Sequence, residues 1–144
     1  MSGPVLVTGA AGFIGSSPTR GLLGAGRSVV ALDKLAYAGP RAAPAAGGGR
    51  PGYVFVQGDI ADETAVARVF AEHRPSAVMN LAAESHVDRS IDAPAAFVDT
   101  NVVGTLVLLQ AARRGLETLD ASDRAAFRFL HVSTDEVYGS LGHE

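Results

Sequence analysis

The sequence contains no cysteine and no tryptophan, and only one of its 12 basic residues, Lys34, is a lysine. Without cysteine there are no disulfide bonds, no thiol catalysis and no cysteine-ligated metal. The basic residues are scattered among 15 acidic ones, which argues against a surface for nucleic acid or an anionic membrane. The four histidines show no metal-ligand spacing, so we expect no metal site.

Long apolar runs are missing as well. No uninterrupted run approaches the roughly 18 residues that span a membrane, and the first residues lack the basic and apolar regions of a signal peptide. A chain of 144 residues is long enough for one domain with a real core and short for two. We therefore expect one cytoplasmic domain over residues 1–144, with no membrane or nucleic-acid partner.

Strand and helix patterns alternate along the chain and predict an α/β fold. Strands are expected at 4–8, 28–33, 53–57, 77–82 and 127–133, and helices at 13–25, 63–73 and 93–115. This alternation favours a Rossmann-like, doubly wound parallel sheet of about five strands in the order 3-2-1-4-5. Residues 38–52, rich in Gly, Pro and Ala, are predicted to be a loop. The ligand crevice is expected at the carboxyl ends of the strands, where the strand order reverses.

Individual residues indicate where the helices begin. Asp62 is a candidate N-cap, and Asp92 is another, with Pro94 in the first turn that follows it. Pro18 falls inside the first predicted helix, where proline removes a backbone donor at a cost of roughly 3 kcal/mol. We expect a kink there, or a helix that begins late.

The turn after the first strand carries glycines at Gly9, Gly12 and Gly15. Such a turn allows a tight bend, close approach of a pyrophosphate and close packing of the next helix, whose N-terminus attracts the anion. Asp33 ends the second strand 18 positions after Gly15, where a carboxylate accepts hydrogen bonds from the adenosine ribose and disfavours NADP. NAD is therefore the predicted cofactor. The alternatives are an ordinary glycine-rich turn and a solvated acid.

Three further segments carry a resemblance to a known family. They are Asp33 to Gly39 (DKLAYAG), Asn80 to Ile91 (NLAAESHVDRSI) and His131 to Ser140 (HVSTDEVYGS). With the glycine turn, the sequence resembles the dTDP-glucose 4,6-dehydratases, which are extended short-chain dehydrogenases/reductases. The likeness covers essentially the whole chain.

The resemblance implies a lyase that acts on dTDP-glucose or a related nucleotide sugar. In that family NAD oxidises C4 of the hexose, water leaves across C5 and C6, and hydride returns to C6. By resemblance Thr134 binds the C4 oxygen, Asp135 protonates the departing hydroxyl and Glu136 removes the C5 proton. Adjacent carboxyl groups at a strand end can be driven to different pKa values, as acid and base catalysis requires. The alternative is that both are solvated acids at the start of a loop.

The resemblance also implies a set of cofactor contacts, and Ser85 would touch the sugar as well. These contacts are the three glycines with Phe13 and Ile14, then Asp33, Lys34, Leu35, Ala36, Asp59, Ile60, Leu81, Ala82, Ala83, Glu84, Ser85 and Thr100. Asp59 could instead merely form a turn. For His86, Asp88 and Arg89, a local polar network within a loop is at least as good an interpretation as a catalytic role. His131, in the middle of a predicted strand, is read as a packed core histidine rather than a ligand.

The chain also departs from the family pattern. It stops at Glu144, whereas the family continues, so we expect a truncated chain without the Tyr-x-x-x-Lys pair or the C-terminal sugar-nucleotide domain. Such a chain should be nearly inactive alone. The alternatives are a non-catalytic NAD-binding module and part of another sugar-nucleotide epimerase or dehydratase. The full-length family suggests a homodimer, and helix 93–115 is read as core or subunit interface. The strand at 127–133 should be an uncovered edge.

Overall fold

The computed structural model describes residues 3–36 and 48–139, and the side chains of 87–89 and 136 lie outside the description. Five parallel strands form one sheet in the order β3-β2-β1-β4-β5. The strands are β1 (Val5–Thr8), β2 (Val29–Asp33), β3 (Tyr53–Gln57), β4 (Ala77–Asn80) and β5 (Arg128–His131). The predicted fold class and strand order are confirmed, and β5 is the predicted edge strand.

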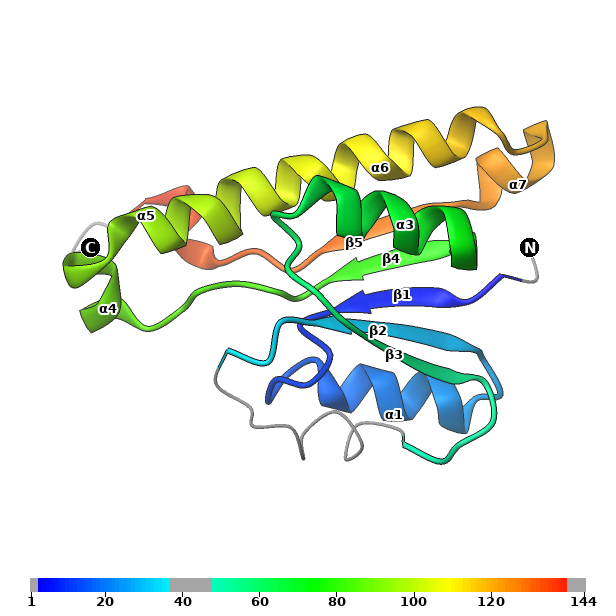
Figure 1. Cartoon of the computed structure of the whole chain (residues 1–144), viewed down its shortest axis with the longest axis horizontal. Coiled ribbons are helices and arrows are strands. Elements are labelled where there is room, and N and C mark those ends of the chain that lie inside the picture. Colours follow the sequence, from blue (N-terminus) through cyan, green and yellow to red (C-terminus); the bar gives the residue numbers. More distant parts are fainter. Residues whose placement is uncertain (1–2, 37–47, 140–144) are drawn as a thin grey trace, which may run out of the picture.

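Helices cover both faces of this sheet (Figure 1). One face carries α1 (Ser16–Gly24), and the other carries α3 (Glu63–His73) and α6 (Thr105–Glu117). The remaining helices are α4 (Val87–Asp92), α5 (Pro94–Phe97), the π-helix η1 (Val98–Gly104), α7 (Ala121–Ala126) and the 3₁₀ helix η2 (Asp135–Tyr138). Most of the predicted loop at 38–52 lies outside the described residues.

Side chains alternate along the central strands and build a core on each face. Leu6 of β1 packs with Val66 and Leu108 on the side of α3 and α6. Its neighbour Val7 packs with Val29 on the other side, where Leu22 of α1 adjoins it. Because β1 and β2 are buried on both faces, they are nearly continuous apolar runs, as expected of a parallel sheet.

The predicted helix starts were partly correct. Asp62 caps α3, since its carboxylate accepts hydrogen bonds from the amides of Thr64 and Ala65 at 2.9 and 3.0 Å. Helix α1 begins late, at Ser16, so Pro18 lies in the first turn, where its missing donor costs little. The prediction of Asp92 as a cap was wrong. Asp92 ends α4, and the cap position of α5 is Ala93, without a side-chain hydrogen bond.

The helix predicted at 93–115 is observed as one helical segment from Pro94 to Glu117. Its middle part, η1, is a π-helix rather than an α-helix. Gly104 ends the π-helix against Ile60, since a Cβ at Gly104 would lie 2.5 Å from Cγ1 of that side chain. By length and mean hydropathy (1.4) this 24-residue segment could cross a membrane, but a single such helix is weak evidence. Its inward residues Leu108 and Ala111 are buried against the sheet, as in core helices that pass the same test.

Candidate functional site

The glycine turn lies between β1 and α1, at the carboxyl end of the central strand. Gly9 has a φ of 63°, and a Cβ there would lie 2.8 Å from the amide nitrogen of Ala82. A Cβ at Gly15 would collide with the carbonyl oxygen of Gly9. These two glycines are therefore required by the fold itself, through backbone conformation and close packing.

Gly12 is different, because a Cβ there would meet only the carbonyl oxygen of Gly9, at 3.2 Å. That contact would be tight but not a collision, so a close ligand is a further reason for glycine at this position. In the described part of the chain the amides of Phe13 and Ile14 donate no hydrogen bond. Their side chains are exposed, so this segment offers backbone donors at a helix N-terminus, as an anion site requires.

Asp33 joins the glycine turn to the end of β2. One carboxylate oxygen accepts a hydrogen bond from the Ala11 amide at 2.9 Å, and the other accepts one from the Leu35 amide at 2.7 Å. Leu35 takes a φ of 58°, which turns the chain back over the carboxylate. Each oxygen keeps acceptor capacity for a further donor, such as a ribose hydroxyl.

A pocket of about 140 Å³ opens at this end of the sheet. Its walls come from the glycine turn, the end of β2, the loops that follow β3 and β4, and η1. Lining residues are Gly9, Gly12, Leu32, Asp33, Lys34, Ala36, Gly58, Asp59, Ile60, Leu81, Ala82, Ala83, Glu84 and Thr100. The structure thus brings together most of the cofactor contacts expected from the sequence. Phe13, Ile14, Gly15, Leu35 and Ser85 lie beside this wall and do not line it.

Lys34 connects the segments around the pocket. Its Nζ lies 2.9 Å from a Glu84 carboxylate oxygen and 3.8 Å from Asp59, and it donates to the Thr100 hydroxyl at 3.0 Å. The side chain of Asn101 holds the backbone of Glu84 by two hydrogen bonds, at 2.9 and 3.0 Å. The sequence indicated Lys34, Glu84 and Thr100 only as separate cofactor contacts and gave no signal for Asn101.

A second polar network, which the sequence analysis missed, lies at the center of the sheet. The Thr8 hydroxyl donates to the Asn80 amide oxygen at 2.5 Å and accepts from the amides of Leu81 and Ala82 at 3.2 Å each. It thereby fixes the start of the loop that lines the pocket. The Asn80 side-chain nitrogen lies 3.1 Å from Nδ1 of His131. His131 is exposed, so its prediction as a core histidine was wrong: β5 is an edge strand.

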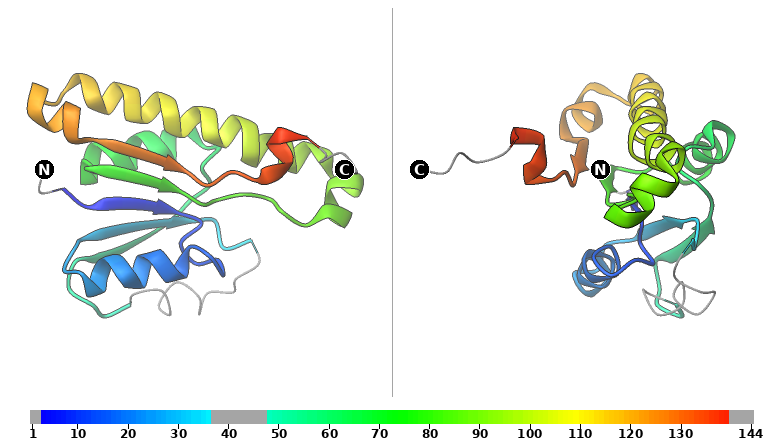
Figure 2. Two further views of the ribbon diagram at one scale, coloured as in Figure 1. Left: turned by 180° about the vertical axis from the view of Figure 1, so that it is seen from behind. Right: turned by 90° about the vertical axis from the view of Figure 1, so that its left-hand side faces the viewer.

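Thr134 and Asp135 follow β5, at the same carboxyl edge of the sheet, and both are exposed. The Thr134 hydroxyl donates to the Asp135 carboxylate at 3.3 Å. Glu136 lies in η2, and its side chain is outside the described residues. Thr134 and Asp135 do not line the pocket, and Figure 2 shows η2, in orange-red, to one side of the body.

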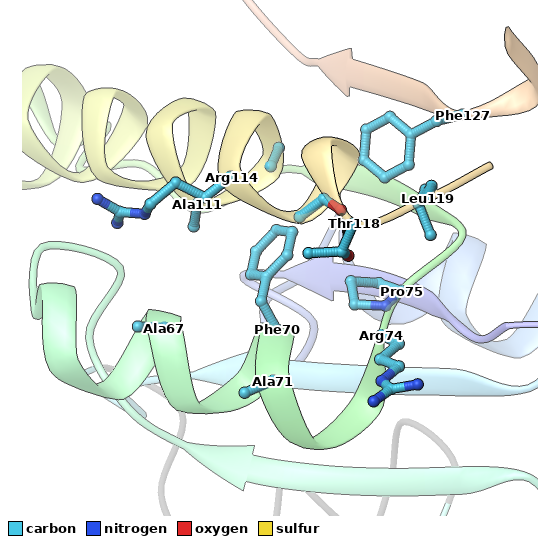
Figure 3. A pocket seen from close by; sticks show the side chains of 12 residues that line it. Ala67, Phe70, Ala71, Arg74, Pro75, Ala111, Arg114, Thr118, Leu119 and Phe127 are labelled. Atoms are coloured by element: carbon cyan, nitrogen blue, oxygen red, sulfur yellow. Dashed lines mark hydrogen bonds between the residues drawn. The ribbon is translucent and has the colours of Figure 1, made fainter. Parts of the chain in front are cut away.

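A larger cavity, of about 480 Å³, lies between α3 and α6 and against Phe127 (Figure 3). Phe70 and small apolar residues line it, while the guanidinium groups of Arg74 and Arg114 extend away from it (Figure 3). Arg114 instead pairs with Glu63 at 3.0 Å. No carboxylate or imidazole lines this cavity, so it offers nothing for acid-base chemistry.

The pKa values of Tyr53 and Asp120 are displaced. Burial, and secondarily the charge of Asp33, raise the pKa of the Tyr53 hydroxyl on β3. Hydrogen bonds from the Asp123 amide and the Ser122 hydroxyl lower the pKa of Asp120, the N-cap of α7. Asp120 is remote in sequence from the pocket segments, whereas the shift at Tyr53 partly reflects the charge of Asp33 in the pocket wall.

Comparison with known families gives a match over nearly the whole chain. The model for GDP-mannose 4,6 dehydratase matches residues 6–144. The dTDP-glucose 4,6-dehydratase 1 of Escherichia coli K12 is 56% identical over 140 residues, and that of Neisseria meningitidis serogroup B is 52% identical over 139. Each match covers 96% of this chain and 39% of the relative, so the chain spans about two fifths of their length. The resemblance expected from the sequence is confirmed.

Solved structures agree in fold. A dTDP-glucose 4,6-dehydratase from Streptomyces venezuelae, solved with NAD bound, is 44% identical with a TM-score of 0.79, over 98% of this chain and 42% of that one. A UDP-glucose-4-epimerase from Stenotrophomonas maltophila, also solved with NAD, is 33% identical with a TM-score of 0.80, over 98% of this chain and 40% of the other. Dehydratases and epimerases thus share this arrangement of strands and helices.

Proposed function

This chain belongs to the GDP-mannose 4,6 dehydratase family, and from that membership we propose that its pocket binds NAD for the dehydration of a nucleotide sugar. The observation that carries the proposal is the glycine turn: among the described residues, the amides of Phe13 and Ile14 have no hydrogen-bond partner, and the Ala11 amide of the same turn bonds to the Asp33 carboxylate. The amides would hold the pyrophosphate, and Asp33 the adenosine ribose. Two structural relatives solved with NAD support the same cofactor.

The remaining contacts follow from the pocket wall. Asp59 and Ile60, after β3, would flank the adenine, and the loop from Leu81 to Ser85 would lie along the dinucleotide. Gly12 lines the pocket, and without a side chain it lets the pyrophosphate approach the backbone closely. The residues present therefore suit the cofactor.

The substrate proposed is dTDP-glucose or a related nucleotide sugar, because the curated relatives are dTDP-glucose 4,6-dehydratases. NAD, when bound, supplies the oxidation at C4 and the hydride returned to C6. Thr134 would bind the C4 oxygen, with Ser85 also touching the sugar. Asp135 would protonate the leaving hydroxyl and Glu136 would take the C5 proton. Support for these roles is their position after β5, at the carboxyl edge that also forms the pocket.

The proposal predicts that NAD stabilises this chain. A ligand at 100 times its dissociation constant adds about 2.7 kcal/mol to the free energy of unfolding. For a chain of this size we expect the melting temperature to rise by roughly 5–10 °C. Differential scanning fluorimetry measures the shift, and calorimetry with NAD measures the dissociation constant. The absence of any shift at millimolar NAD would contradict the proposal.

Adding the nucleotide sugar separates the dehydratase from the alternatives. Binding of dTDP-glucose to the NAD complex, with formation of a 4-keto-6-deoxy sugar, supports the dehydratase. Binding of NAD alone supports a non-catalytic module. Interconversion of UDP-glucose and its C4 epimer would support the epimerases, which share the fold.

An exposed apolar stripe supports a homodimer. Val98, Val102, Leu106 and Leu109 recur at helical spacing on the segment from Pro94 to Glu117, and each side chain is about half exposed. The opposite face packs on the sheet, so the stripe is one-sided, unlike a span surrounded by lipid. We propose that a second copy covers it, and that the protein is cytoplasmic, without a membrane or nucleic-acid partner.

The dimer predicts that Leu106→Ser shifts the chain towards the monomer. The serine hydroxyl would be buried without a partner in the proposed interface, so we expect the dimer dissociation constant to rise at least tenfold. Sedimentation velocity over a concentration series measures it. The control is Arg20→Ser, at an exposed position of α1 on the opposite face of the sheet. Equal sedimentation of both variants and the parent chain would show that the stripe is not the interface.

A further inference from the structure

Lys34 follows Asp33 directly in the sequence, but its ammonium group contacts the side chains of other segments. Glu84 lies 2.9 Å from Nζ and Asp59 lies 3.8 Å from it, while the Thr100 hydroxyl accepts a hydrogen bond at 3.0 Å. The Glu84 side chain is only 5% exposed, so its charge depends on this partner rather than on water. The cation beside the ribose-binding acid is thus already neutralised.

The described residues of the pocket wall offer no replacement for that cation. Among the lining residues that the structure describes, Lys34 is the only basic one, and three are acidic: Asp33, Asp59 and Glu84. A phosphate group placed near Asp33 would therefore meet net negative charge. Sites that accept such a phosphate supply an arginine or another available cation.

Glu84 is well placed to keep Lys34 occupied. Asn101 fixes the Glu84 backbone from the π-helix, through the amide and the carbonyl of the same residue. Thr100, the residue before Asn101, is 4% exposed and accepts from Lys34 as well. The acid and the hydroxyl are thus presented to Lys34 from segments that are linked to each other.

We infer that Glu84 is a specificity-determining residue: by holding the Lys34 ammonium group, the only cation among the described lining residues, it keeps that cation from a phosphate beside Asp33 and so disfavours NADP. The inference rests on the proposed dinucleotide function of the pocket. Asp33 repels the additional phosphate directly, whereas Glu84 acts through Lys34. Glu84→Gln should make the Lys34 ammonium group available to a phosphate, because the uncharged amide holds it less strongly than the carboxylate does. The amide oxygen can still accept a hydrogen bond from Lys34, which helps to preserve the fold.

The experiment titrates the 144-residue chain with NAD and with NADP by calorimetry and compares the ratio of the two dissociation constants. The parent chain should prefer NAD. Glu84→Gln should move the ratio towards NADP by about tenfold, the effect of gaining one charge-assisted hydrogen bond to phosphate. The double variant Lys34→Gln with Glu84→Gln should lose this gain in NADP affinity, because the cation is gone. If Glu84→Gln acted only by loosening the loop, the double variant would keep the gain. Glu117→Gln, an exposed acid at the end of α6, is the matched control.

Circular dichroism confirms that each variant is folded before titration. If Glu84→Gln is not folded, Asp59→Asn is used instead. The Asp59 carboxylate is 41% exposed, so its replacement leaves no buried charge without a partner. It should shift the ratio in the same direction by a smaller factor. An unchanged ratio in the folded variants, or equal affinity of the parent chain for both dinucleotides, overturns the inference alone. A parent chain that binds neither dinucleotide overturns the proposed function, and the inference with it.

Discussion

Gly15→Ala is expected to destabilise the chain by roughly 3 kcal/mol and to abolish NAD binding. The added Cβ would collide with the carbonyl oxygen of Gly9, and Gly9 cannot retreat. Its amide is bonded to the Leu32 carbonyl at 2.9 Å, and the backbone of Ala82 lies against its other side. The turn must therefore open, which displaces the amides that would hold the pyrophosphate. Urea unfolding gives the free energy of unfolding, and calorimetry gives the NAD affinity.

Gly21→Ala is the matched control, because it adds the same methyl group in helix α1 where a Cβ meets nothing within 4 Å. This variant should gain up to about 1 kcal/mol from helix propensity and keep its NAD affinity. If Gly15→Ala loses less than about 1 kcal/mol, the turn is not packed as tightly as the structure indicates. Equal loss in both variants would point to the helix rather than the turn.

The strand order and the turn were predictable because local patterns and connection rules determine them. Apolar runs over residues 5–8 and 29–33 identify buried strands, and right-handed crossovers leave few ways to order parallel strands. Asp62 caps α3 through contacts within three residues, so the sequence contains that information locally. Pro18 likewise marks the first turn of a helix, where its missing donor is harmless.

The interruption of the long helix was not predictable, because it depends on a distant contact. Residues 98–104 are mostly weak helix formers, but this composition does not specify a π-helix, and it is the π-helical segment that presents both Thr100 and Asn101 to the pocket loops. The close approach of Gly104 to Ile60 comes from the packing of this helix on the loop after β3. No pattern within the helix signals either contact.

For the candidate site, too, the residues were predictable from the sequence, but their contacts with each other were not. Resemblance indicated which residues surround the pocket, since Asp33 and Glu84 lie in the segments that carry it and Asp59 was carried over singly. It gave no hint that Lys34 pairs with Glu84, 50 positions away, because pairing is a property of the folded arrangement. His131 was misread for a similar reason: a strand pattern does not say whether the strand lies at the center or at the edge of the sheet.

The second large effect is expected at Lys34. Lys34→Met should lower the free energy of unfolding by about 3–5 kcal/mol, because the Glu84 carboxylate, 5% exposed, would be left buried without its cation. Urea unfolding measures the loss. Arg113→Met removes one positive charge from an exposed position on α6 and should cost less than about 1 kcal/mol.

The double variant Lys34→Met with Glu84→Met identifies the cause of that loss. Replacing a buried ion pair by apolar side chains of similar volume is often neutral, so the double variant should recover most of the stability that Lys34→Met loses. A lysine that acted only through the packing of its aliphatic stem would show little loss in Lys34→Met itself, because methionine already replaces the stem. A double variant as unstable as Lys34→Met would therefore show that the pair does not carry the charge balance of the pocket wall.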